Sequence, residues 1–132
     1  MITGLEVTKV EANRKTSENI GNMKFNINFE DVKVDKENVT VGFTFSAIYE
    51  GEGAKEVGNL KISGNLFSKE AKKDADEIAS TWKEKNTLPL KYAEDVINIL
   101  NFQCGARGTL VAYSIGFAAP LPFSRAKIEP TS

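Results

Sequence analysis

Hydrophobic and polar residues alternate along four stretches in the first half of the chain. The clearest stretch runs from Val39 to Tyr49, where apolar residues occupy the odd positions and threonine, glycine or serine usually lies between them. Similar alternation occurs around residues 5–12, 23–34 and 60–66. An alternating pattern is typical of a strand with one buried face, so the sequence predicts four strands within about residues 4–67. The short polar link 35–38 suggests that these strands form an antiparallel meander.

Two of the alternating stretches change parity part way along. The first changes after Val7 and the second after Phe29. A shift of one residue moves every later side chain to the opposite face of a sheet, so each change indicates either a β-bulge or a strand that crosses between surfaces. The apolar residues that follow the two changes are Val10, Ala12, Val32 and Val34. We therefore expect these four residues on the surface opposite the other apolar residues, where a second copy of the chain would cover them.

Beyond residue 67 the spacing of apolar residues becomes helical. A first helix is expected over about residues 68–86, with Ser68 as its N-cap and Asn86 at its end. A second helix is expected over about residues 89–115, with Pro89 in its first turn. The apolar face of this second helix consists of Ala93, Val96, Ile97, Leu100 and Cys104. The remaining residues, 116–132, include Pro120 and Pro122 and are expected to form an extended tail.

These elements predict a single α+β domain over residues 1–132, in which two C-terminal helices pack on one face of a four-stranded antiparallel sheet. The chain contains eight phenylalanines, more than one small two-layer core requires. Exposed aromatic surface usually indicates self-association or a binding groove. The residues expected to line such a groove are Phe25, Phe29, Phe45, Tyr92 and Phe102.

Composition narrows the possible functions. The chain has no histidine, which is the commonest general base and metal ligand, and it has a single cysteine. We therefore expect no enzymatic activity, no metal and no cofactor. Seventeen basic and 18 acidic residues give a net charge of −1, which disfavours a nucleic-acid-binding role.

The sequence also bears on cellular location. Its first residues lack the basic stretch and apolar core of a secretory signal. The longest uncharged run, residues 108–124, is shorter than the ~20 apolar residues of a spanning helix. We expect a cytoplasmic protein without membrane insertion.

Arg107 is the one charged residue deep in the apolar part of the second expected helix. It could recognise a carboxylate ligand, or it could cap the helix and pair with Glu94 or Asp95 of a neighbour. The structural role is favoured, because buried arginines are usually paired. Gly105 and Gly108 beside it are more typical of close helix packing than of a phosphate loop.

The order of elements and the second helix together resemble the SecB-like export chaperones. The start of that helix is similar at Pro89, Tyr92, Ala93, Ile97 and Leu100. Its end and the following tail are similar at Arg107, Gly108, Pro120 and Pro122. The resemblance implies a sheet-and-helix fold, a dimer-of-dimers assembly and ATP-independent binding of unfolded polypeptides. The outward strand positions are polar rather than acidic, unlike the family's surface for the translocation ATPase, which suggests a divergent relative such as an archaeal or toxin–antitoxin-associated chaperone.

The leading hypothesis is thus a holdase that buries apolar segments of unfolded or pre-export polypeptides in a groove. Its expected partners are such clients and further copies of itself, as a dimer or tetramer. One alternative is an oligomeric scaffold or interaction module that binds no client. The other is a small ligand-binding or catalytic α+β domain that uses Arg107 and a carboxylate such as Glu94.

Overall fold

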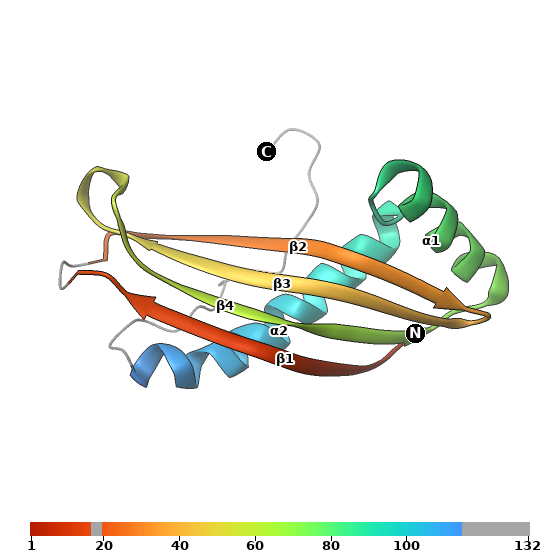
Figure 1. Cartoon of the computed structure of the whole chain (residues 1–132), viewed down its shortest axis with the longest axis horizontal. Coiled ribbons are helices and arrows are strands. Elements are labelled where there is room, and N and C mark those ends of the chain that lie inside the picture. The colour runs from red at the N-terminus through yellow and green to blue at the C-terminus, as the bar shows by residue number, and fades with distance from the viewer. Residues whose placement is uncertain (17–19, 115–132) are drawn as a thin grey trace.

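The computed structural model describes residues 1–16 and 20–114, and it contains one four-stranded antiparallel sheet and two α-helices (Figure 1). The strands are β1 (Ile2–Arg14), β2 (Asn22–Asp35), β3 (Asn38–Glu50) and β4 (Glu56–Lys69). The helices are α1 (Lys72–Lys85) and α2 (Leu90–Ser114), and a short 3-10 turn, η1 (Glu52–Ala54), joins β3 to β4. The predicted α+β class is confirmed. The expected extended tail, residues 116–132, lies outside the described residues.

The strand order is β1-β4-β3-β2. Strands β2, β3 and β4 form the expected meander. In the turn between β2 and β3, Lys36 has a left-handed conformation with a φ of 58°. The prediction of a meander is wrong for β1, which pairs with β4 instead of β2. Strands β3 and β4 have the most completely buried apolar positions and lie at the centre, whereas the more exposed β1 and β2 become the two edges.

The two parity changes in the sequence are β-bulges. In β2, Phe29 faces Phe43 and Asp31 faces Gly42, so Glu30 is the extra residue. In β1 the irregularity falls between Val7 and Lys9. A bulge adds one residue to one strand. This extra residue offsets the change of parity, so the apolar residues before and after the bulge lie on the same face of the sheet.

This register corrects the expected placement of four apolar residues. Beyond the bulges, Val10 and Ala12 face Ile62 and Leu60, and Val32 and Val34 face Val41 and Val39, whose side chains are buried in the core. Ala12, Val32 and Val34 are half-buried against that core, while Val10 is 46% exposed. The prediction that these residues lie on the opposite surface is therefore wrong.

Both helices pack against the apolar face of the sheet. In α1 the buried residues are Ala75 and Ile78, and Asn86 ends the helix in a left-handed conformation, with its N–H donating to the carbonyl of Trp82 at 2.8 Å. Helix α1 begins at Lys72, so the expected N-cap role of Ser68 is wrong. β4 extends to Lys69, and the Ser68 side chain is buried within it.

Helix α2 presents its expected face to the sheet. Ala93, Val96, Leu100 and Cys104 are buried there, whereas Ile97 is half-buried. Burial raises the pKa of the Cys104 thiol to about 11, so this side chain stays protonated near neutral pH and acts as a small core residue. No helix in the described part of the chain is long and apolar enough to cross a membrane.

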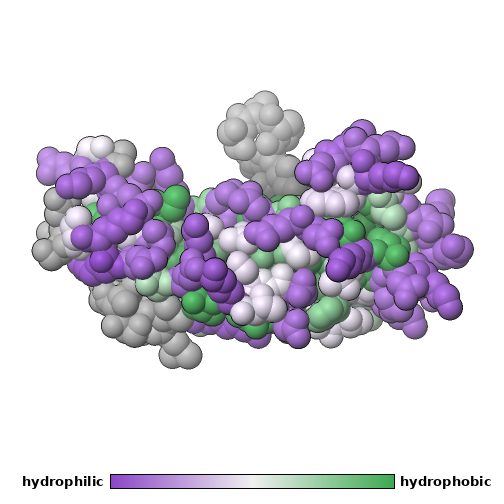
Figure 2. All heavy atoms as spheres, in the orientation of Figure 1, coloured by the Kyte–Doolittle hydropathy of each residue, from purple (hydrophilic) through white to green (hydrophobic). Residues whose placement is uncertain are grey.

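The other face of the sheet is polar. Thr44 and Ser63 share a hydrogen bond across β3 and β4 at 3.1 Å, and Asn13 donates to Asn59 across β1 and β4 at 3.4 Å. Figure 2 shows mainly hydrophilic residues on the side it presents, with hydrophobic residues confined to small patches. Large recesses lined partly by apolar side chains are found instead beside the helices.

Candidate functional site

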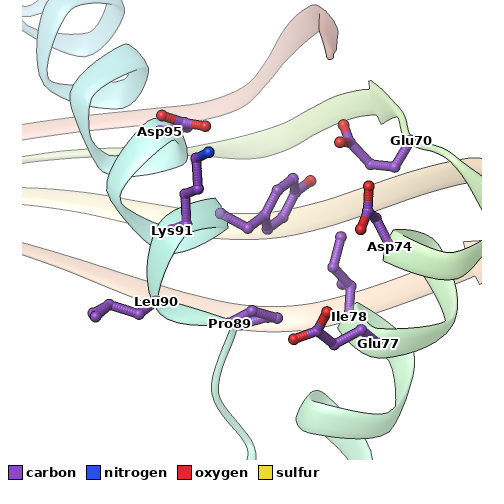
Figure 3. A pocket seen from close by; sticks show the side chains of 9 residues that line it. Glu70, Asp74, Glu77, Ile78, Pro89, Leu90, Lys91 and Asp95 are labelled. Carbon is purple, nitrogen blue, oxygen red and sulfur yellow. The ribbon is translucent and has the colours of Figure 1, made fainter.

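Two adjoining hollows open where α1, α2 and the first residues of β1 meet. The first measures about 440 Å³ and is lined by Glu70, Asp74, Glu77, Ile78, Pro89, Leu90, Lys91, Tyr92 and Asp95 (Figure 3). The second measures about 380 Å³ and is lined by Met1, Ile2, Glu70, Tyr92, Asp95, Asn98 and Ile99. Because Glu70, Tyr92 and Asp95 line both hollows, we describe them together as the α1–α2 groove.

Helical spacing explains how one wall of the groove is built. Residues three or four apart in a helix lie on the same face. Tyr92, Asp95 and Ile99 follow this spacing along α2, so an aromatic ring, a carboxylate and an aliphatic side chain share one side of that helix. The first turn of α2 is set by the Ala93 N–H, which donates to the Pro89 carbonyl at 2.8 Å.

The opposite wall comes from α1 and from Glu70, which precedes it. Glu77 and Ile78 lie three and four residues after Asp74, so two carboxylates and one buried aliphatic side chain line the groove from α1. Figure 3 shows the carboxylates of Glu70, Asp74 and Glu77 on this side and Asp95 on the other.

Tyr92 lies between the two hollows and is held in place by β4. Its hydroxyl shares a 2.6 Å hydrogen bond with the Ser68 hydroxyl. Burial raises the pKa of Tyr92, and the Ser68 hydrogen bond only partly offsets this, so the phenol is neutral near physiological pH. A neutral, half-buried ring therefore contributes to the groove an apolar lining that is anchored to the sheet.

The rim of the groove is acidic. The carboxylates of Asp74, Glu77 and Asp95 form no ion pair or hydrogen bond within the described residues. Glu70 accepts a hydrogen bond from the α-ammonium group of Met1, which also donates to the Lys69 carbonyl at 2.7 Å. The groove therefore combines apolar side chains with carboxylates on both walls.

The five residues expected to form a client groove do not come together. Phe25 and Phe45 are in contact, with ring centroids 6.2 Å apart, but Phe45 is fully buried and Phe25 is 36% exposed at the β2 edge. Phe29 is half-buried against the same core. Tyr92 lines both hollows, whereas Phe102 lines neither and is 72% exposed on α2. Of the five, only Tyr92 lines the groove; client binding by the other four stays a sequence-based prediction, separate from any role of the groove.

The environment of Arg107 differs from the one that the sequence predicted. Its guanidinium is exposed and donates to the carbonyl of Gln103 at 3.2 Å and to the Gln103 side-chain oxygen at 2.6 Å. The expectation of an arginine deep in the apolar part of α2 is wrong, because position 107 falls on the solvent side of the helix. It lines neither hollow.

Sequence reasoning did not identify the acidic rim. Asp74 and Glu77 read as part of a solvated helix face, because they lie off the apolar stripe of α1. The available signal in the sequence was the position of Asp74, four residues before the apolar Ile78 and three before Glu77. What that face meets depends on how α1 packs beside α2.

The fold is similar to that of a known chaperone. No family model matches the sequence, and no curated protein matches it. Among solved structures, the chain is similar to the SecB-like chaperone Rv1957 of Mycobacterium tuberculosis, in complex with a ChAD peptide from the Rv1956 HigA1 antitoxin. The TM-score is 0.56 and the identity is 13%, and the match covers 100% of this chain and 91% of the other. The SecB-like fold expected from the sequence is thus supported, at the level of fold.

Proposed function

We propose that this protein is an ATP-independent holdase that binds unfolded or extended polypeptide segments in the α1–α2 groove. The observation that carries the proposal is a groove lined by Tyr92, which is hydrogen-bonded to the sheet, in a fold similar to that of a chaperone structure containing a bound peptide. The aliphatic residues Ile2, Ile78 and Leu90 line the groove and offer apolar contact to a client side chain. Carboxylates at the rim can accept hydrogen bonds from client backbone or side-chain N–H groups.

Leu90 provides a direct test of where a client binds. It lines the groove and is 63% exposed, so Leu90→Ala removes apolar contact surface at little expense to the core. We expect this variant to bind a denatured, fluorescently labelled test protein about fivefold more weakly, since about 1 kcal/mol of apolar contact is lost. Fluorescence anisotropy measures the affinity, and light scattering measures whether the protein delays aggregation of the test protein.

Phe102→Ala is the matched control, because Phe102 is an exposed apolar residue of α2 outside the groove. It should leave client affinity within about twofold of the unmutated protein. Equal losses in both variants would move the binding surface out of the groove. If the unmutated protein binds no denatured client at all, the holdase proposal is wrong.

We also propose that the chain self-associates through β1. This strand is 13 residues long, and among the described strands it lies at the edge of the sheet and pairs only with β4. An exposed edge of this length is a template for pairing with a second copy, and twofold symmetry would bring β1 against β1. Val10 contributes exposed apolar surface on the helix side of this edge.

The expected mass in sedimentation is two or four times the 14.5 kDa of one chain. Val10→Lys places a charge at the β1 edge and should shift the equilibrium toward the monomer by at least tenfold. Asn26→Lys places the same charge on the exposed surface of the other edge strand and should leave the mass unchanged. A 14.5 kDa mass for the unmutated chain at high concentration contradicts the proposal.

A further inference from the structure

We infer that Ser68 is a positioning residue of the α1–α2 groove. Its hydroxyl holds the Tyr92 ring as a partition between the two hollows, and this partition limits the size of the client side chain that each hollow admits. The inference rests on the proposed holdase function and names a contact that determines specificity in the same groove. It follows from the place of Ser68 in β4, from its hydrogen bond and from the hollows beside Tyr92.

Ser68 is a polar residue at a core position. It follows Ile62 and Leu66 on the buried face of β4, and its side chain is itself buried. Its partners across the strands are Ile2 of β1 and Val39 of β3. A hydroxyl in such surroundings is costly unless it is hydrogen-bonded, and an apolar residue would fill the position without that requirement. Packing alone therefore does not explain a serine here.

The partner of the Ser68 hydroxyl is Tyr92. The two side-chain oxygens are 2.6 Å apart, and this hydrogen bond joins the first turn of α2 to the end of β4. A tyrosine ring changes place by changing rotamer about χ1, and such a rotation carries the phenol oxygen away from Ser68. The bond therefore holds the ring in one of its possible positions, as satisfied buried polar pairs do when they specify a single arrangement.

The Tyr92 ring has open space beside it. It lines both the hollow of about 440 Å³ and the hollow of about 380 Å³, together with Glu70 and Asp95. Close packing, which is what usually holds a core side chain, is thus incomplete around this ring. A ring released from Ser68 could turn into either hollow. Loss of the hydrogen bond would then remove the partition and join the hollows into one larger site.

A fixed partition limits the size of the side chains that bind. The aliphatic residue Ile2 lines one hollow, and Ile78 and Leu90 line the other. Small aliphatic side chains of a client reach these contacts while the ring stays in place. A tryptophan side chain needs space that the ring occupies, although its larger apolar surface would otherwise favour binding. We therefore expect the groove to prefer the side chain with less apolar surface.

The test uses two labelled 12-residue peptides that differ only at one central position, which is leucine or tryptophan. The unmutated protein should bind the tryptophan peptide about fivefold more weakly than the leucine peptide. Ser68→Ala removes the hydrogen bond and should reverse this order, because the ring then moves aside and the larger apolar surface decides. Anisotropy titrations with both peptides measure the affinities.

Tyr92→Phe removes the same hydrogen bond from the other side and should give the same reversal. The double variant Ser68→Ala/Tyr92→Phe should equal each single variant, because residues that act through one bond are not additive. Ser63→Ala is the matched control. Ser63 lies in the same strand and shares a hydroxyl–hydroxyl hydrogen bond with Thr44 on the polar face of the sheet, so its loss should leave the order unchanged.

Tyrosine NMR reports the position of the ring without any client. In protein with carbon-13-labelled tyrosine, Tyr92→Phe identifies the Tyr92 ring signal. This signal should shift or broaden in Ser68→Ala and stay in place in Ser63→Ala. The melting temperatures of the Ser68 and Tyr92 variants should lie within about 5 °C of that of the unmutated protein, because a phenol freed from Ser68 can reach water in the hollows. A reversed peptide order then reflects the ring and not unfolding.

Two results overturn the positioning role and leave the holdase proposal intact. One is tighter binding of the tryptophan peptide by the unmutated protein, and the other is the same order of affinities in Ser68→Ala as in the unmutated protein. A reversal in Ser63→Ala equal to that in Ser68→Ala also overturns it, because the effect would then not depend on Tyr92. Failure of both peptides to bind overturns both proposals.

Discussion

Gly64→Ala is expected to lower the free energy of unfolding by about 3 kcal/mol and the melting temperature by roughly 10 °C. Gly64 lies in β4 opposite Val7, beside the bulge of β1. A Cβ atom there would lie 2.0 Å from the main-chain carbonyl oxygen of Glu6 and 3.0 Å from the Val7 Cα. Main-chain atoms cannot rotate away as a flexible side chain can, so β1 must shift relative to β4. Denaturant unfolding followed by circular dichroism measures the loss.

Gly42→Ala is the matched control. Gly42 also lies in a central strand, opposite the bulge of β2, but a Cβ atom there has its nearest contact at 3.5 Å, to the Asp31 nitrogen. This is an ordinary van der Waals distance, so the change in stability should stay within about 1 kcal/mol. Similar losses for the two variants would contradict the close approach of β1 to Gly64.

Leu100→Ala is expected to cost about 3 kcal/mol, because it leaves a cavity between α2 and the sheet. Leu100 is fully buried in the core that the helices share with β3 and β4. Phe102→Ala removes a larger side chain only two residues away, yet it should change stability by less than about 1 kcal/mol because Phe102 is exposed.

Thermal or urea denaturation of the two variants therefore tests which side of α2 packs on the sheet. A loss of stability in Phe102→Ala equal to that in Leu100→Ala would show that Phe102 is covered in solution, for example by a second copy of the chain. Sedimentation of the same sample identifies that case.

The sequence by itself determined the fold class and the core. Apolar residues from Val39 to Tyr49 keep one parity, and a strand that obeys this period can bury them on one face only. Helical spacing likewise identified five residues of α2, of which Ile97 is half-buried and the other four are buried: Ala93, Val96, Leu100 and Cys104. Local periodicity is sufficient for such predictions, because the geometry of a single element decides which residues share a face.

The tertiary structure alone decided the strand order and the meaning of the parity changes. A shift of parity is the same in sequence whether the chain changes faces or forms a bulge. Only the pairing of Val32 with Val41 and of Val10 with Ile62 distinguishes the two. Likewise, β1 is next to β4 because of contacts between residues far apart in the sequence.

The groove also depended on tertiary structure. Tyr92 was identified as a candidate from the sequence, but its neighbours Glu70 and Asp74 belong to another part of the chain. From the sequence, the Asp74 carboxylate is expected on a solvated helix face; the packing of α1 beside α2 places it with that of Glu70 around a common hollow. A site built from several elements is a property of their relative placement, and the periodicity within each element carries no information about that placement.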